Sequence, residues 1–125
     1  MKIEVQFDQS ANIMASYNGK VIGMSDSPYM IYLATVGMCS AVYVRAFLQQ
    51  RGMSLEGVTL DELINYNRQE NRVEHIEIQV NLPDSFPAKY EKAIKAVVDQ
   101  CPVKKHFVMP PSVSVVANLE QELIS

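Results

Sequence analysis

Cysteine is scarce in this chain of 125 residues, which contains two, Cys39 and Cys101. With His75 and His106 they could supply four zinc ligands by number, but neither the CxxC nor the HxxxH spacing of a metal site is present. The glycine patterns of nucleotide-binding loops are also missing. The sequence therefore predicts no metal and no cofactor, and the two thiols are the candidate reactive groups.

Positive charge is also limited. The net charge is −3, and the short basic group Lys104-Lys105-His106 is too small for a phosphate-binding surface. The N-terminal MKIEVQFDQ alternates charged and apolar residues and lacks the continuous apolar core of a signal peptide. We therefore expect no nucleic-acid partner and a cytoplasmic protein, because a reducing compartment rarely holds permanent structural disulfides.

Charge is absent altogether from residues 27–44, a segment that just reaches the length of a membrane-spanning helix. Pro28 and Gly37 lie within it, and strand-like patterns lie on both sides of it. A helix that is apolar around most of its circumference is usually buried in a fold or an oligomer. We expect a buried helix rather than a membrane span.

Period-two alternation predicts strands in the N-terminal part, at residues 2–8, 13–17 and 21–24. Asn18-Gly19 suits the type I′ turn of a hairpin, which needs two positive φ angles. Asp26 or Ser27 can cap the uncharged helix, which should begin at Pro28 and run to about Arg51.

The C-terminal part continues with two strands, at residues 58–66 and 73–82, joined by a turn. A second helix follows from residues 83–85, with apolar positions at Phe86, Tyr90, Ile94, Val97, Val98 and Cys101. Pro102 interrupts this helix, and residues 112–119 are expected to form a last strand. The prediction is one α+β domain over residues 1–125 with a mostly antiparallel sheet.

The two cysteines have different local settings. Cys39 lies inside the apolar helix, where burial raises a thiol pKa and where an inert core cysteine is a common alternative. Cys101 precedes Pro102 and can cap a short helix to about Phe107, where free amide groups favour a thiolate. Lys104 either adds positive potential or is simply solvated, and His106 is either a local base or a surface residue.

Two motifs carry a resemblance to a known family. Ser27-Pro28 followed by Gly37-Met38-Cys39-Ser40, with the later Cys101-Pro102-Val103, resembles the OsmC/Ohr superfamily. The resemblance implies an OsmC-like fold with the order β-β-β-α-β-β-α-β and a long buried central helix. It also implies an intertwined homodimer with the sites at the dimer interface.

Peroxidase members of that superfamily imply a role for each thiol. Cys39 would attack an organic hydroperoxide, Cys101 would resolve the sulfenic acid as a disulfide, and a dithiol reductant would reset the pair. Those members use an arginine from an N-terminal strand and a glutamate after the motif proline. Here no arginine precedes Arg45, which six residues turn away from Cys39, and Tyr29 holds the glutamate position. We therefore expect Cys39 to be mostly protonated and any peroxide reduction to be slow.

A second hypothesis is a binding module that kept the fold without turnover. Its dimer cleft would hold a small apolar ligand among Tyr29, Met30, Tyr32, Leu33, Met38 and Phe107. A purely structural role is the third alternative. Two thiols of ordinary pKa would favour it.

Overall fold

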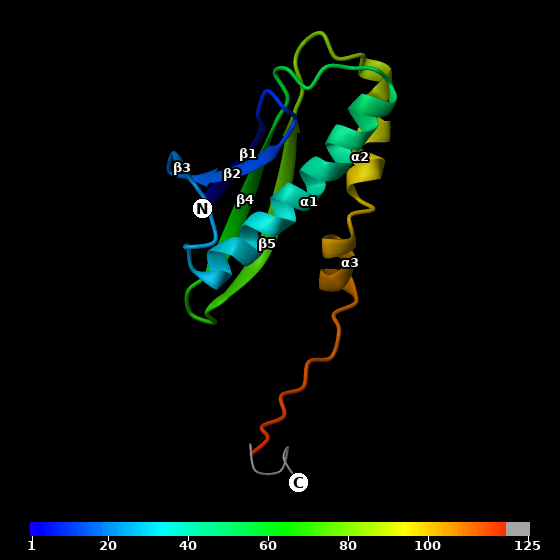
Figure 1. The fold of residues 1–125 in the computed structure, drawn as a ribbon. Coiled ribbons are helices and arrows are strands. Elements are labelled where there is room, and N and C mark those ends of the chain that lie inside the picture. Colours follow the sequence, from blue (N-terminus) through cyan, green and yellow to red (C-terminus); the bar gives the residue numbers. More distant parts are fainter. Residues whose placement is uncertain (120–125) are drawn as a thin grey trace.

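The main layer of the protein is a five-stranded antiparallel sheet with the order β3-β2-β1-β4-β5. The structure is a computed structural model that describes residues 1–119. Three helices lie on one face of the sheet, with α1 across it and α2 and α3 beside α1 (Figure 1). The elements are β1 Lys2–Phe7, β2 Ile13–Tyr17, β3 Lys20–Val21, α1 Pro28–Gln50, β4 Thr59–Asn67, β5 Arg72–Asn81, η1 Ala88–Tyr90, α2 Glu91–Val98 and α3 Pro102–Val108.

The N-terminal strands form the predicted meander, although the third strand is shorter than expected. Asn18 and Gly19 have φ angles of 50° and 80°, as the type I′ turn requires. The third strand ends at Val21 rather than at residue 24. The reason is a local turn in which the Gly23 amide donates to Asp26 Oδ2 at 2.8 Å, which directs the chain toward α1.

Helix α1 begins and ends where the sequence predicts. Ser27 rather than Asp26 is the cap, because Ser27 Oγ accepts a hydrogen bond from the Met30 amide. The helix is long and apolar enough to cross a membrane by length and composition, with a mean hydropathy of 1.6. Half of its most apolar 18-residue stretch is buried in the fold. Val44 and Leu48, for example, pack against the sheet as part of the core.

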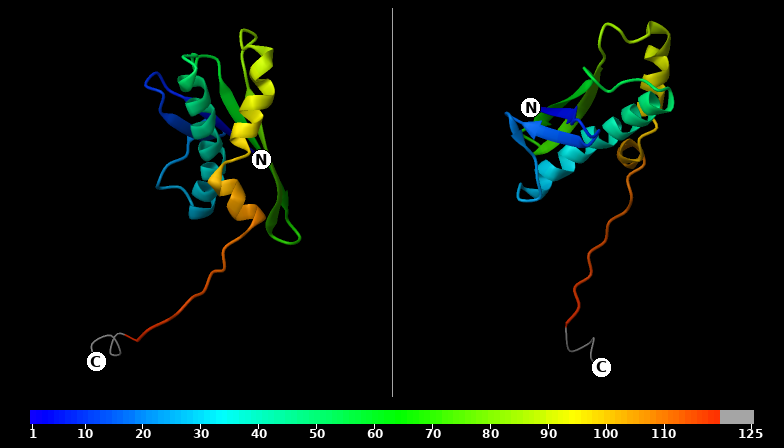
Figure 2. Two further views of the ribbon diagram at one scale, coloured as in Figure 1. Left: turned by 90° about the vertical axis from the view of Figure 1, so that its right-hand side faces the viewer. Right: turned by 45° about the horizontal axis from the view of Figure 1, so that its top comes forward.

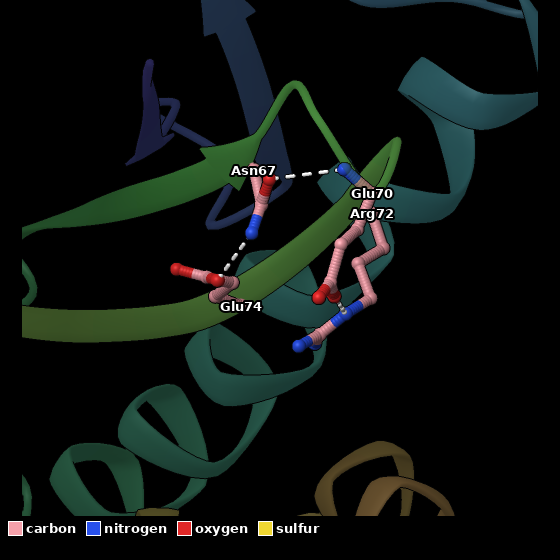
Figure 3. Close-up of polar contacts among 4 residues, drawn as sticks. All are labelled: Asn67, Glu70, Arg72 and Glu74. Carbon is pink, nitrogen blue, oxygen red and sulfur yellow. Dashed lines mark hydrogen bonds and ion pairs between the residues drawn. The ribbon is translucent and has the colours of Figure 1, made fainter.

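Strands β4 and β5 form the expected hairpin, within two residues of the predicted bounds. Its turn is held by polar side chains, since Asn67 donates to Glu74 and accepts from the Glu70 amide, while Arg72 pairs with Glu70 (Figure 3). The inner face of β5 is only half-buried, because β5 is an edge strand of the sheet.

The second helix begins later than expected. Residues 82–87 are irregular, and regular helix starts at Glu91 after the short η1 turn. Pro87 explains the delay, because proline lacks an amide donor and holds the preceding Phe86 away from helical geometry. As predicted, Pro102 starts a new short helix and Cys101 occupies its cap position.

The expected last strand at residues 112–119 is not present, and this prediction is wrong for the single chain. The segment leads away from the sheet and pairs with no strand of the described residues (Figure 2). A strand needs a neighbouring backbone for its hydrogen bonds, and no strand of the part that the structure describes lies beside this segment. Its apolar side chains are therefore exposed, namely Val113, Val115, Val116 and Leu119.

Candidate active site

The fold brings the two thiols together, as the family resemblance implies. Cys39 lies in the middle of α1 and Cys101 lies between α2 and α3, yet their Sγ atoms are 2.6 Å apart. Both cysteines are free. A disulfide has an S–S bond of about 2.05 Å, so the two sulfurs are in contact but not bonded.

Packing between α1 and the C-terminal helices positions Cys101. Ile94 of α2 is 2% exposed and belongs to the core beside α1. The rings of Phe47 and Tyr90 meet edge to face, with centroids 5.9 Å apart. Cys101 is itself 2% exposed. The return of the chain along α1 therefore fixes Cys101 against Cys39.

The surroundings of Cys39 disfavour its thiolate. Burial raises the pKa of the Cys39 thiol to about 11, and the hydrogen bond from Cys101 adds to the increase. One group acts in the opposite direction, because the backbone amide of Val103 faces the Cys39 sulfur and lowers its pKa. The neutral thiol is therefore the resting form of Cys39.

The amide groups of the α3 helix were expected to face Cys101. Cys101 caps α3 through its backbone only, and its side chain makes no capping hydrogen bond. Its sulfur points to Cys39 instead. The first-turn amide of Val103 consequently faces Cys39, the thiol to which the sequence assigned no such help.

The basic side chains that the sequence singled out, Arg45, Lys104 and His106, make their polar contacts away from the two sulfurs. Arg45 lies away from the thiols, as predicted, and its Nη1 donates to the Ala11 carbonyl at 2.8 Å. Lys104 pairs with Asp99 at 2.6 Å, and His106 Nδ1 lies 2.7 Å from the Pro102 carbonyl oxygen. None of these three side chains has a hydrogen bond to either sulfur.

The predicted ligand residues fall into two groups. Tyr29, Tyr32 and Phe107 form an exposed aromatic surface, in which both neighbouring ring pairs have centroids 6.0 Å apart. Leu33 is buried in the core, and Met30 and Met38 pack against that core. These six residues therefore do not form one cleft in the single chain.

A groove with a volume of about 1040 Å³ lies beside Cys101. Its walls come from α1, β5, α2 and α3, so no local stretch of sequence could reveal it. Phe107 and Lys104 also line it, together with Val36, Ser40, Ile78 and Val80.

Sequence reasoning also missed Glu62, which is completely buried in β4. The inward positions of this strand are Leu60, Glu62 and Ile64. The period-two alternation therefore places a carboxylate on the apolar face, and this was the signal in the sequence. Burial raises the pKa of Glu62 to about 7, and a hydrogen bond from the Gly37 amide partly offsets this increase.

The sheet, the long core helix and the paired thiols define an α+β protein with a dithiol site. The profile of the OsmC-like protein family matches residues 23–116. The chain therefore belongs to the OsmC-like family. A comparison with curated protein sequences gave no match.

Two solved structures share the fold. An OsmC-like hydroperoxide resistance protein from Jannaschia sp. CCS1 has a TM-score of 0.68 at 10% identity, covering 95% of this chain and 92% of that chain. A Psychrobacter arcticus 273-4 protein named for osmotic stress induction and detoxification response has a TM-score of 0.56 at 17% identity, covering 83% and 78%. At these identities the likeness establishes the architecture.

Proposed function

We propose that this protein reduces organic hydroperoxides with a pair of thiols. The supporting observation is the 2.6 Å separation of the Cys39 and Cys101 sulfurs, contributed by distant parts of the chain. A hydroperoxide resistance protein is also among the structures with this fold. The half-buried position of Cys39 suits it as the attacking thiol, while the fully buried Cys101 suits the resolving role.

The chemistry takes place in three balanced steps. The Cys39 thiolate attacks the terminal oxygen of the hydroperoxide, the O–O bond breaks, and an alcohol leaves with the thiol proton. The sulfur is now a sulfenic acid. Cys101 attacks it to form a disulfide and release water, and a dithiol reductant then returns both cysteines to thiols. A reducing compartment such as the cytoplasm would supply that reductant.

The proposed reaction is slow at neutral pH. A thiol with a pKa of about 11 is almost entirely protonated there, and no cation bonds to it within the described residues. The Val103 amide is the group that favours the anion. The rate should therefore rise with pH as the thiolate fraction increases.

Turnover of cumene hydroperoxide with dithiothreitol tests this function. We expect consumption by the wild-type protein and complete loss of enzymatic turnover in Cys39→Ser. Ser10→Ala, an exposed substitution in the β1–β2 turn, is the control. Equal rates in wild type and Cys39→Ser would overturn the proposed peroxidase function.

We also propose that the working form is a homodimer. The exposed valines of residues 112–119 and the free edge of the ten-residue strand β5 support strand pairing between two copies. Analytical ultracentrifugation should give a dimer for the full chain and a weaker one for Val113→Lys/Val115→Lys. Ser114→Lys, on the other face of an extended segment, is the matched control. A wild-type monomer at high concentration would contradict this assembly.

The groove beside Cys101 supports a second candidate function, the binding of a small apolar ligand. Its volume of about 1040 Å³ is just above the usual range for small-molecule sites, which is about 300–1,000 Å³. Native mass spectrometry of freshly purified Cys39→Ser should then detect a bound compound. Empty protein under mild conditions would argue against this function.

A further inference from the structure

Among residues 1–119, Glu62 is the one acidic or basic residue that is buried, with 0% exposure. It lies in the middle of β4, opposite Ile3 of β1 and Ile78 of β5. Its Oε1 atom accepts a hydrogen bond of 3.1 Å from the Gly37 amide of α1. Its Oε2 atom is buried and has no hydrogen-bond partner among residues 1–119.

Gly37 provides the space that Glu62 occupies. A Cβ atom at position 37 would lie 2.7 Å from Glu62 Oε1 and 3.0 Å from Val5 Cγ2. Glycine in a helix interior is unfavourable, and so is a carboxyl group in an apolar core. The two residues thus depart from the ordinary rules of packing at the same point, and each accommodates the other.

This contact lies close to the thiol site along the chain, since Gly37 precedes Cys39 by two residues. Local departures of this kind in natural proteins are concentrated at functional sites. Buried titratable groups are likewise typical of such sites. The location next to Cys39 therefore connects the Glu62–Gly37 contact with the thiol site.

We propose that Glu62 is a buried proton-binding residue that controls the reactivity of the Cys39 thiol. Neutral Glu62 permits formation of the Cys39 thiolate, and ionised Glu62 opposes it. The inference rests on the proposed role of Cys39 as the attacking thiol. In this proposal Glu62 is a positioning residue: its carboxyl group bonds to the backbone of α1 and its charge acts on the Cys39 sulfur across the helix.

The surroundings of Glu62 leave its charge uncompensated. The neighbours of Glu62 that the structure identifies are uncharged: Ile3 of β1 and Ile78 of β5 lie opposite it in the sheet, and Gly37 of α1 lies against its carboxyl group together with Val5. Burial raises the pKa of Glu62 to about 7, so its charge changes in the neutral range. Around Cys39 the titratable neighbour is Cys101, and the Lys104–Asp99 ion pair lies beyond it.

Residues two apart in a helix point to roughly opposite sides, so the Glu62 carboxyl and the Cys39 sulfur lie on either side of α1. Taking their separation as the width of a helix with its side chains, about 12 Å, a negative charge on Glu62 lowers the thiolate population of Cys39 about ten-fold at an effective dielectric constant of about 20. Ionisation of Glu62 therefore offsets part of the increase in thiolate that rising pH brings.

The test measures the rate of alkylation by iodoacetamide against pH in a Cys101→Ser background, where Cys39 is the one thiol. Adding Glu62→Gln should leave the rate unchanged at pH 5.5 and raise it about ten-fold at pH 9, with a midpoint near 7. Glu77→Gln, at an exposed position of β5, is the control and should not alter the profile.

Alkylation needs no hydroperoxide, so this result is independent of whether the proposed peroxidase activity exists. A rate ratio between Glu62→Gln and its parent that stays constant with pH would overturn the inference. If Glu62→Gln does not fold, the pH profile of alkylation in the Cys101→Ser protein tests the proposal by itself. Its plot of log rate against pH should flatten between pH 6 and 8, and a straight line of unit slope through that range would contradict the proposal.

Discussion

The two sides of helix α1 have opposite characters. On the side of the sheet, Gly37 and Val44 are buried and the Glu62 carboxyl lies against the helix backbone. On the other side, Thr35 and Val42 are exposed and Cys39 is half-buried beside Cys101. One helix is therefore a core element on one side and carries a candidate reactive group on the other.

Each side holds an acid whose ionisation is hindered by burial. The pKa of Glu62 rises to about 7, which leaves it able to change charge under neutral conditions. The pKa of Cys39 rises to about 11, so its thiolate is rare there. The difference indicates that the buried side can respond to pH, while the thiol side depends on groups such as the Val103 amide.

The largest expected effect concerns the thiol side. In Cys101→Ser, the Cys39 sulfenic acid has no resolving thiol, so excess cumene hydroperoxide should oxidise it to the sulfinic acid. Intact mass spectrometry should show a gain of two oxygens in the variant and a loss of two hydrogens in the wild type. An unmodified Cys39 in the variant would break the assignment of reactivity to this side of α1.

The next effect concerns the buried side and the dependence of stability on pH. The folded-state pKa of Glu62 is about 7, above the ordinary 4.5, so the folded protein binds this proton more tightly than the unfolded chain does. The resulting stability is fully present below pH 4.5 and is lost as pH rises through 7. Between pH 5 and pH 8 we expect a loss of about 2–3 kcal/mol in the free energy of unfolding.

Urea denaturation at several pH values measures this loss. Glu62→Gln should remove the decrease, and Glu77→Gln should retain it. A wild-type protein equally stable at pH 5 and pH 8, with the same unfolding slope in urea, would contradict a buried carboxyl at this position.

Much of the fold follows from sequence patterns. The type I′ turn at Asn18-Gly19 and the start of α1 at Ser27 were predictable because backbone geometry and capping act locally. The motif around each cysteine also singled out Cys39 and Cys101 as the candidate pair of thiols. The missing strand at residues 112–119 was not predictable, because strand formation depends on a neighbour that local sequence does not specify.

The site itself was only partly predictable. The closeness of Cys39 and Cys101 followed from the family motifs, whereas the direction of the Val103 amide depends on how α3 is seated. The groove beside Cys101 and the Glu62–Gly37 contact each combine distant elements. Side-chain periodicity can flag Glu62 as unusual but cannot say which helix residue faces it.

A smaller effect is expected from Gly37→Ala. Alanine favours a helix by about 1 kcal/mol over glycine, but its Cβ would lie 2.7 Å from Glu62 Oε1 in a buried site. We expect a net loss of about 1–2 kcal/mol in unfolding free energy. Adding Glu62→Ala should make the Gly37→Ala substitution less harmful, and strictly additive effects would argue against direct contact.

The smallest effect should come from the exposed side, at Thr35→Ala. The Thr35 hydroxyl donates to the Tyr32 carbonyl at 2.6 Å, and both groups can bond to water instead. We expect a change of less than about 0.5 kcal/mol in the same urea experiment. A loss as large as that of Gly37→Ala would show that this side of α1 is covered by another chain.

Peptide mapping after one equivalent of cumene hydroperoxide tests the central claim most directly. Reduced wild-type protein should yield a linked pair of peptides containing Cys39 and Cys101 within a single chain, reversed by dithiothreitol. Recovery of both cysteines as free thiols, or linkage only between different chains, would contradict the account of a paired dithiol site.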